Sequence, residues 1–571
     1  MSIRKSGKRK SRKRGGSVSG KLPTSPAKSP TSPACSWWKT LLAIGLLFGI
    51  SACLNCIGLS WGQPGDPPWE PDSIAGARTI YHMPNLFGQW KYKYPPFHFM
   101  INAAAYKPFL NHWRKNPAPG GRRIGTEVLN TEQISTLIMV SRIISALMGA
   151  GAVVAVFLTA RVLFNDDLAA FFAGLVLAFS MLFVFYNHSG KPDAPRTFWF
   201  AWSLYWAVKA TYIGKWRHFA FLGLFCSLAV CTKDSMAGYV IGLAIAVWFA
   251  MIGRARGAGE SFNKALTTIF STKVLIAVVV AAFCFALINN VLFAPEAFLR
   301  RMGHWIGGPG TTGYQGDFEG QLPLLWRTCR NSYYALGWPL LLAVAISLVY
   351  CVIKFRWESA FAVTPLIVFY LIVIMNIRFS YPRFLLAAFP SLALLTGKAS
   401  ADYLRCRKMP LVVRALPLVF VYASSLLYCI GLDLEFVQET RYEAEKWLAT
   451  HVSKNERVVA LSGAAYAPRI YMIGCKYNFV MYRPKNEELI KKIRPYTNYL
   501  VLSEPEFEIP TAFDQDFLIA LLEGRMGYKE VARFSNKYLY PQKTIFGFAG
   551  WPFKRPSVVS PEIIILKRED K

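Results

Sequence analysis

The run Trp37–Leu59, WWKTLLAIGLLFGISACLNCIGL, decides the fold class of this chain. Its only charged residue is Lys39, and it exceeds the ~20 residues that a helix needs to cross hydrocarbon. Similar runs recur along the 571 residues, of which 53% are hydrophobic and only 17% charged. We therefore predict a polytopic α-helical membrane protein, because a β-barrel would show short alternating segments instead.

The segment before this run, residues 1–36, is first basic and then rich in Ser-Pro pairs. It cannot build a packed core, so we predict a disordered cytoplasmic tail. Much of the formal charge of +32 lies there. A basic cluster directly before a membrane helix favours an anchor and orientation signal over a nucleic-acid site, so we expect no nucleic-acid partner. A cleavable signal peptide is not expected, because the run is too long and lacks a cleavage motif.

The segment after the run, Trp61–His98, is WGQPGDPPWEPDSIAGARTIYHMPNLFGQWKYKYPPFH. It holds the acids Asp66, Glu70 and Asp72 among prolines and aromatic residues. We interpret it as half of an active site on the outer side of the membrane, with Asp72 as its main residue. Simpler alternatives stay open: Asp72 as a helix N-cap, and Asp66 and Glu70 as solvated loop acids.

Membrane topology depends on Pro95–Leu110, which could be a short span or a helix on the membrane surface. We choose the interfacial placement, because Arg161 then joins the other basic residues inside. Residues 37–432 would contain about eleven spans with the N-terminus in and the C-terminus out. The external loops would be 61–132, 187–195 and 294–331. Residues 433–571, with strand-like runs between helical stretches, predict a small external α/β domain.

The cysteines predict neither a disulfide framework nor a metal site. Most of the eleven lie in or near apolar segments, where they act as small buried hydrophobes. Cys53 and Cys56 have the spacing of half a zinc site, but no second pair follows. We assign no metal ligand and leave a divalent metal open as a cofactor.

Three cations, Lys233, Arg378 and Arg383, depart from the positive-inside pattern by lying on the predicted outer side. Cations at the membrane boundary suit a lipid-borne phosphate, and carboxylates suit proton abstraction from a hydroxyl. Plainer roles are open for each: an ion pair of Lys233 with Asp234, and headgroup anchoring by the two arginines. The full set of predicted site residues is Asp72 and Asp193 as catalytic groups, and Lys93, Tyr94, His188, Lys233, His304, Arg378 and Arg383 as substrate-binding groups. For the two histidines a hydrogen-bonded structural role is favoured over a catalytic one.

Four motifs follow one another in a fixed order: Glu70-Pro71-Asp72-Ser73, the run Lys93–His98 (KYPPFH), the run Ser141–Leu147 (SRIISAL), and the run His188–Pro195 (HSGKPDAP). Together they resemble the membrane glycosyltransferases of the C-type fold, and within them the protein O-mannosyltransferases and aminoarabinose transferases. The resemblance implies an inverting transfer from a polyprenyl-phosphate sugar. It implies Asp72 as the base or acceptor-orienting carboxylate, assisted by Asp193, with Lys233 and Arg383 on the carrier phosphate.

The chain departs from the family pattern in two places. Ser73 stands where the family often has a second acid after the aspartate, which weakens a paired-carboxylate mechanism. Lys93-Tyr94 stands where aminoarabinose transferases have Glu-Lys, which argues against their lipid specificity.

The sequence thus predicts a glycosyltransferase of the inner (plasma) membrane that acts outside the cytoplasm on a protein, lipid or glycan acceptor. The main alternative is a transporter or flippase, which would place polar residues within its helices and show repeated halves. Here the polar residues gather in loops and at helix ends. An inert scaffold is the third alternative.

Overall fold

The computed structural model describes residues 37–66, 68–308, 318–480, 493–503, 515–536 and 559–569. The predicted tail of residues 1–36 lies outside the described residues, as does most of the helical stretch expected near 487–493.

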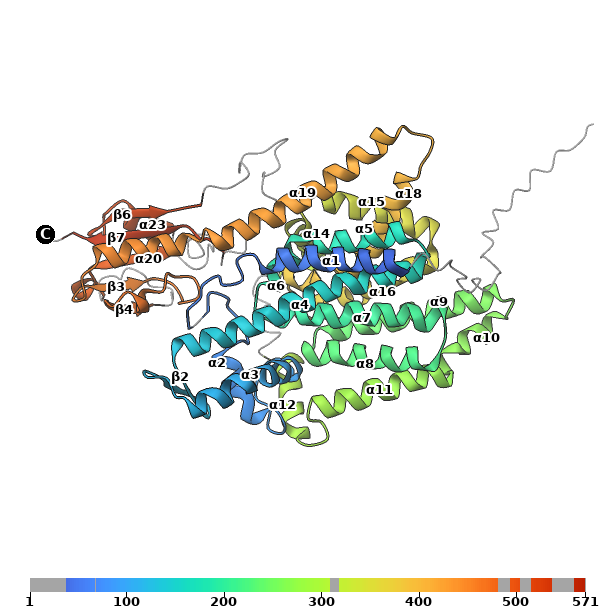
Figure 1. Ribbon diagram of the computed structural model, residues 1–571, viewed down its shortest axis with the longest axis horizontal. Helices are drawn as coiled ribbons and strands as arrows, with labels where there is room; N and C mark the ends of the chain where they lie inside the picture. Colours follow the sequence, from blue (N-terminus) through green and yellow to red (C-terminus); the bar gives the residue numbers. More distant parts are fainter. Residues whose placement is uncertain are drawn as a thin grey trace, which may run out of the picture.

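A helical bundle forms the larger part of the molecule (Figure 1). Its apolar sequence explains this, since helices satisfy every backbone hydrogen bond inside hydrocarbon. The bundle helices are α1 (Trp37–Cys56), α4 (Thr131–Phe164), α5 (Asp167–Ala178), α6 (Met181–Asn187), α7 (Asp193–Tyr212), α8 (Trp216–Thr232), α9 (Met236–Gly257), α10 (Phe262–Leu266), α11 (Thr272–Ile288), α14 (Gln321–Leu336), α15 (Trp338–Lys354), α16 (Arg356–Phe369), α18 (Phe389–Leu404) and α19 (Leu411–Val437).

Several of these helices can cross a membrane. Among the described residues, seven are long and apolar enough, or up to nine if each bent pair counts as one span. The prediction of a multi-pass helical membrane protein is therefore confirmed. The shorter apolar helix α8 runs alongside these spans (Figure 1). The exact count and the orientation stay predictions.

Two apolar runs are interrupted. The run Leu168–Tyr186 is split into α5 and α6, which meet at a bend of 62° beside the extended residue Ser180. The run Tyr333–Val352 is split at Gly337, whose φ of 75° ends α14 in a conformation that glycine adopts readily. The expected external loop 294–331 is also partly helical, with α12 (Pro295–Trp305) and the start of α14 inside it.

The first external segment is structured rather than a simple loop. It contains α2 (Ala77–His82), the short helix η1 (Met83–Asn85), α3 (Phe97–Lys115) and a hairpin of β1 (Arg122–Ile124) and β2 (Glu127–Leu129). The Ile74 N–H donates to the Gly190 carbonyl at 3.1 Å, so this segment meets the α6–α7 loop. Both loops must then lie on one side of the membrane, which favours the interfacial placement of α3, because a spanning α3 would separate them.

A five-stranded sheet follows the bundle. Its order is β4-β3-β5-β7-β6, with β3 parallel to both neighbours and β7 antiparallel to both of its own. Alternate residues of β5 pack on opposite faces, Leu500 in one buried cluster and Val501 in another, as the period-2 pattern of a strand requires. The elements are α20 (Thr440–His451), β3 (Arg457–Ala460), β4 (Lys476–Phe479), β5 (Tyr499–Ser503), α23 (Gln515–Leu522), β6 (Tyr528–Phe534) and β7 (Ile563–Arg568).

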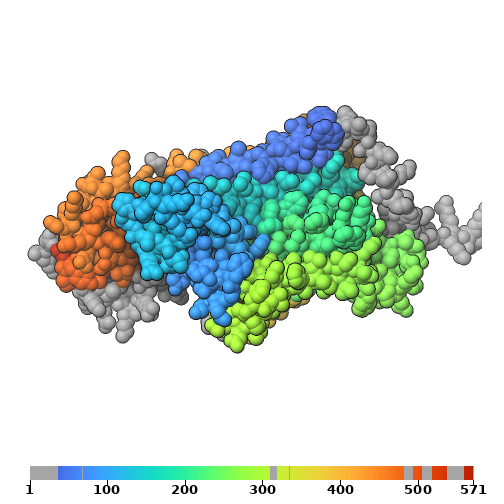
Figure 2. Space-filling model, turned by 60° about the horizontal axis from the view of Figure 1, so that its bottom comes forward, coloured from blue at the N-terminus to red at the C-terminus, as the bar shows by residue number. Residues whose placement is uncertain are grey.

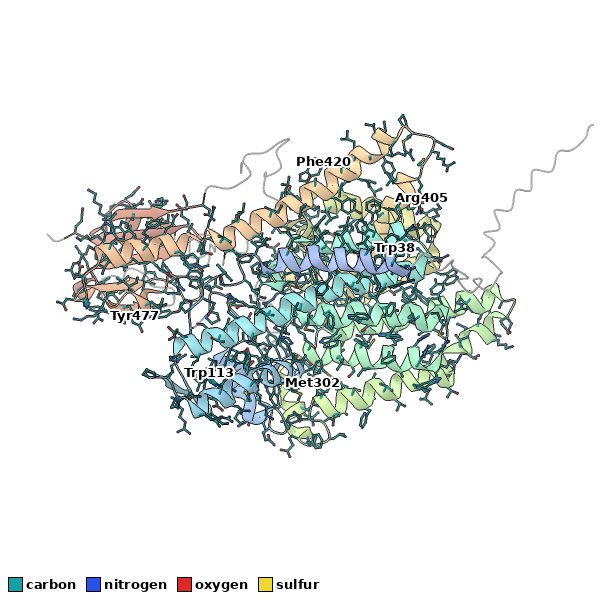
Figure 3. The ribbon with its side chains drawn as sticks, viewed as in Figure 1. Trp38, Trp113, Met302, Arg405, Phe420 and Tyr477 are labelled. Carbon is teal, nitrogen blue, oxygen red and sulfur yellow. The ribbon has the colours of Figure 1, made fainter. Side chains whose placement is uncertain are left out.

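The molecule is elongated, with this sheet at one end and the bundle at the other (Figure 1). Tyr477 lies on the sheet, whereas Trp38 and Arg405 lie near the opposite end (Figure 3). The blue and cyan surface of the first external segment lies between the orange C-terminal part and the green helices (Figure 2).

Candidate active site

Asp72 lies between two cations from distant parts of the chain. Its Oδ1 accepts from Lys93 Nζ at 3.0 Å, and its Oδ2 accepts from an Arg383 guanidinium nitrogen at 3.1 Å. Arg383 belongs to the short helix η5 (Pro382–Ala388). Burial alone would raise the pKa of Asp72, but Arg383 and Lys93 outweigh it and hold this pKa well below its usual range. The carboxylate is therefore ionised at neutral pH.

The backbone at Asp72 is in the left-handed region, with φ of 65°. Aspartate tolerates this conformation better than most residues, but it still costs energy and is found often at functional sites. The N-cap alternative for Asp72 is wrong, because α2 begins at Ala77 and its N-cap is Gly76.

Asp193 forms a second, deeper charge cluster at the start of α7. Its Oδ1 accepts from Lys233 Nζ at 2.8 Å and contacts an Arg196 guanidinium nitrogen at 3.0 Å. All three side chains are almost completely buried. The alternative in which Lys233 forms a local ion pair with Asp234 is wrong, because Asp234 pairs with Arg301 on α12.

Arg383 and Tyr94 connect the two clusters. The Arg196 side chain that holds Asp193 donates to the Arg383 carbonyl at 2.5 Å, while the Arg383 side chain holds Asp72. The ring of Tyr94 lies between the lysines of the two clusters, with Lys93 Nζ and Lys233 Nζ at 5.1 and 5.3 Å from its centroid. The predicted residues Asp72, Lys93, Tyr94, Asp193, Lys233 and Arg383 thus form one connected site.

Glu70 and Arg142 clamp the two acidic loops together. Arg142, on α4, donates to a Glu70 oxygen at 2.9 Å, and the other Glu70 oxygen accepts from the Gly190 N–H at 2.6 Å. Both side chains are fully buried, so Glu70 is not the solvated loop acid that the sequence left open. Arg142 belongs to the motif Ser141–Leu147, and no role was predicted for it. An arginine inside an apolar helix was the signal that could have found this pair.

The C-terminal domain anchors the same loop. Trp61 donates to Glu439 at 2.7 Å, and Arg469 donates to the Pro64 carbonyl at 2.7 Å. The fully buried ring of Trp69 lies 3.9 Å from the Arg441 guanidinium, at cation–π distance. The first external loop is therefore held by both domains.

Two cations of the site were not predicted: Arg196, which pairs with Asp193, and Lys191. Lys191 lies between α6 and α7, is buried, and points its Nζ over the Tyr186 ring at 5.7 Å. Burial and Arg383 lower the pKa of Lys191 to about 8, although Glu70, Asp193 and Asp72 oppose the shift. Lys191 therefore adds a proton that can be lost near neutral pH. Its position in the HSGKPDAP motif, two residues before Asp193, was the available signal.

One protein family matches part of this chain. Residues 132–285 match the family described as dolichyl-phosphate-mannose-protein mannosyltransferase. The predicted family resemblance is confirmed. The mannosyltransferase match extends from α4 to α11 and includes Arg142, Asp193 and Lys233, whereas Asp72 and Arg383 lie outside it. A search of curated proteins found no match.

The chain is also similar to several solved structures, among them the following three. ArnT from Cupriavidus metallidurans bound to undecaprenyl phosphate is 14% identical, with a TM-score of 0.45, over 93% of this chain and 98% of that one. The oligosaccharyltransferase of Archaeoglobus fulgidus, in complex with zinc and sulfate, is 15% identical, with a TM-score of 0.44, over 81% and 68%. The Saccharomyces cerevisiae Pmt1-Pmt2 complex bound to its sugar donor is 17% identical, with a TM-score of 0.34, over 46% and 34%.

The remaining predicted residues have other contacts. His188 contacts the carbonyls of Val184 and Ile57 at 2.8 and 2.7 Å, which is the structural role left open for it. His304 packs on Trp305, and Arg378 lies over the Phe318 ring. Among the described residues, neither forms an ion pair with Asp72 or Asp193. Within the described ranges of the chain, no three His, Cys, Asp or Glu side chains converge to hold a metal ion.

Proposed function

We propose that this chain is an inverting glycosyltransferase that moves a sugar from a polyprenyl-phosphate donor to an acceptor hydroxyl outside the cytoplasm. The observation that carries the proposal is the pair of linked clusters. An ionised carboxylate, Asp72, is partly open to solvent, and buried cations lie directly behind it. A donor phosphate and an acceptor hydroxyl need opposite charges, and this site supplies both within one network.

The cations support the departure of the phosphate. As the bond between the sugar C1 and the phosphate oxygen breaks, negative charge develops on the leaving phosphate. Lys233, Arg196 and Arg383 offer fixed positive charge that needs no reorganisation during the reaction. Asp193 pairs with both Lys233 and Arg196 and so offsets the repulsion between their positive charges. We therefore assign Asp193 a positioning role.

Asp72 faces the acceptor. The acceptor oxygen forms the new bond to C1 from the face opposite the phosphate, and its proton passes to Asp72. The depressed pKa of Asp72 makes it a weak base, so its main task is to orient the hydroxyl until the new bond makes that proton acidic. One carboxylate suffices for this step, which agrees with Ser73 standing where the family often has an acid.

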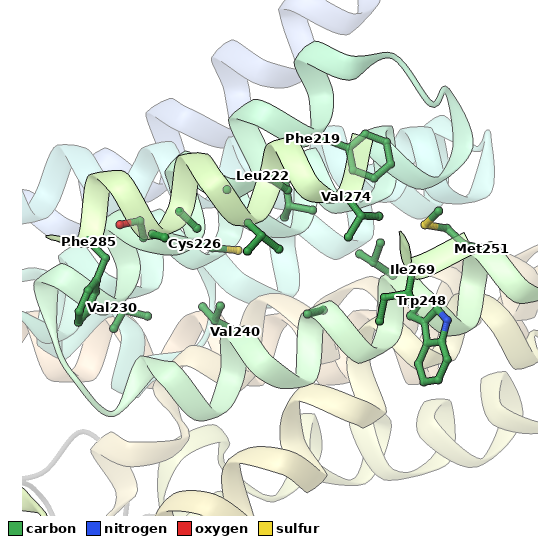
Figure 4. Close-up of a pocket in the computed structure, with 18 residues that line it drawn as sticks. Phe219, Leu222, Cys226, Val230, Val240, Trp248, Met251, Ile269, Val274 and Phe285 are labelled. Atoms are coloured by element: carbon green, nitrogen blue, oxygen red, sulfur yellow. The ribbon is translucent and has the colours of Figure 1, made fainter. Parts of the chain in front are cut away.

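An apolar groove supports a lipid-linked donor. It has a volume of about 530 Å³ and is formed by α8, α9, α11 and the short helix η2 (Thr267–Phe270). Val230 and Phe285 lie at one end, and Trp248 and Met251 at the other (Figure 4). Val230 is three residues before Lys233 in the chain. An isoprenoid chain in the groove would thus have its phosphate end near the cations.

The test is complementation of a strain that lacks this chain. Envelope glycans and proteins are compared by mass spectrometry with the wild type and with Asp72→Asn, since asparagine tolerates the left-handed backbone and removes only the charge. We expect the wild type to restore a specific hexose or pentose and Asp72→Asn to fail at equal membrane abundance.

The matched control is Asp167→Asn, which removes an exposed carboxylate paired with Arg161 at the start of α5. It should restore the decoration fully. Normal decoration by the Asp72→Asn protein would refute the proposal.

A further inference from the structure

A second cavity, of about 540 Å³, opens beside Asp72. Its walls come from the loop carrying Asp66 and Asp72, from α2, from the β1–β2 hairpin and, at Ala465, from the C-terminal domain. This volume lies in the range of small-molecule sites. Under the proposed function, on which this inference rests, the cavity is where an acceptor meets Asp72.

The carboxylates that line the cavity all have cationic partners. Asp66 pairs with Arg122, Glu70 with Arg142, and Asp72 with Lys93 and Arg383. Their negative charges are therefore compensated by the protein itself.

Two arginines in the same walls have no such compensation. The Arg78 guanidinium donates to the Tyr92 hydroxyl at 3.1 Å, and Arg123 donates to the Gly125 carbonyl at 3.4 Å. Among the described residues neither contacts a carboxylate within ion-pair distance. Both remain exposed, so their other N–H groups can reach a ligand. The cavity thus has an excess of positive charge.

The fold brings these two arginines together. The hairpin turn at Gly125 has φ of 58° and packs so closely on α2 that an added Cβ would lie 3.2 Å from the Ile80 carbonyl oxygen. Arg78 lies on α2, two residues before Ile80, and Arg123 lies on β1, two residues before Gly125. An exposed aromatic side chain, Tyr81, which is 63% exposed, lines the cavity beside them.

We propose that this cavity binds an acceptor sugar that carries a phosphate or a carboxylate. Arginine forks bind both groups through paired N–H donors. Tyr81 offers a flat apolar face for the sugar ring, while the anion lies on Arg78 and Arg123 and an accepting hydroxyl faces Asp72. A neutral sugar would leave the two guanidinium groups without a counter-charge.

Binding to the purified full-length protein in nanodiscs tests this without any transfer reaction. The probes are mannose 6-phosphate, glucuronic acid and mannose, measured by thermophoresis at low and high salt. We expect the wild type to bind one or both anionic sugars about tenfold more tightly than mannose. The two anionic arms tell phosphate from carboxylate. In the double variant Arg78→Ala/Arg123→Ala this preference should disappear while mannose binding stays the same.

The control is Lys91→Ala, which removes an exposed cation of the same external segment outside the cavity and should keep the preference. Equal binding of mannose and the anionic sugars, no binding of either anionic sugar, or a preference that survives the double variant would overturn the proposal. An acidic peptide serves as a fourth probe under the same conditions. If it binds more tightly than both anionic sugars, the proposal is also overturned. Because no sugar is transferred, these outcomes are independent of whether Asp72→Asn abolishes activity.

Discussion

At the scale of single residues, the two carboxylates of the site differ in how deeply they are buried. Asp72 has one third of its side chain exposed, whereas Asp193 is buried against Lys233 and Arg196. Buried charges of this kind persist only when paired. The shallow carboxylate can therefore exchange partners with a substrate, and the deep one can only hold its cations in place.

Lys191 predicts an alkaline limit to activity. With its pKa lowered to about 8, Lys191 carries a charge at pH 7 and loses it as the pH rises through about 8. The positive charge facing a donor phosphate then decreases, so transfer should fall above this pH. Lys191→Arg should move the fall to higher pH, and Lys191→Met should give the low rate throughout. A pH–rate profile measures this, and a profile of Lys191→Arg identical to the wild type would contradict the role.

Glu70 and Arg142 predict a strongly non-additive pair. Glu70→Gln leaves the buried Arg142 without its counter-charge and should destabilise the protein by about 3–5 kcal/mol. The double variant Glu70→Gln/Arg142→Met should recover part of this loss, because no buried charge is left alone. Thermal unfolding in nanodiscs measures both. Additive losses would show that the two side chains act separately.

Sequence patterns predicted several charged residues that the structure brings together, and missed others that are buried in packed contacts. Asp72 was conspicuous as an acid in a loop, and Lys233 as a charge at a helix end of an apolar chain. Glu70 was misread, since a loop acid among prolines gives no sign that Arg142, seventy-two residues later in the chain, lies against it. Arg196 was overlooked because its partner Asp193 is a close neighbour and the contact with Arg383 is remote.

At the scale of secondary-structure elements, the apolar groove of α8, α9 and α11 predicts a dependence on the lipid chain. Ala281 lines the groove, so Ala281→Trp should fill it. Each buried CH₂ contributes about 0.8 kcal/mol, so loss of several contacts should raise KM for a long-chain polyprenyl donor by at least about tenfold. A short-chain donor should be little affected.

Val279→Trp is the matched control for this change. Val279 is on the same helix, is 56% exposed and does not line the groove. If Ala281→Trp impairs short-chain and long-chain donors equally, the groove does not hold the chain.

Element boundaries were predictable where apolar runs end in charges and unpredictable where helices bend inside hydrocarbon. The α5–α6 break occurs in the run Leu168–Tyr186, which has no proline and no charged residue to mark it. After the break α6 packs on α4 and α19, and sequence alone does not reveal the contact with α19. By contrast α4 begins at the capping box of Asn130 and Gln133, which is a local signal.

At the scale of the whole molecule, the two domains share one loop, and its contacts constrain the membrane topology. The first external segment contacts both the α6–α7 loop and the C-terminal domain. Asp72, Asp193 and the five-stranded sheet must therefore lie on the same side. This holds only if α3 lies at the interface and an even number of spans separates the two acidic loops.

Reporter fusions test this topology. Alkaline phosphatase fused after Lys571 should be active, and a green fluorescent protein at the same place should be dark, because the C-terminal domain would be outside. Insertion between α9 and α10, near Gly259, should give the opposite result. A fusion after Gly62 is the control, since it follows α1 and is outside whether or not α3 spans. An inactive phosphatase after Lys571 together with an active one after Gly62 would mean an additional crossing. The contact between Trp61 and Glu439 could then not form, and the placement of the first loop against the C-terminal domain would have to be abandoned.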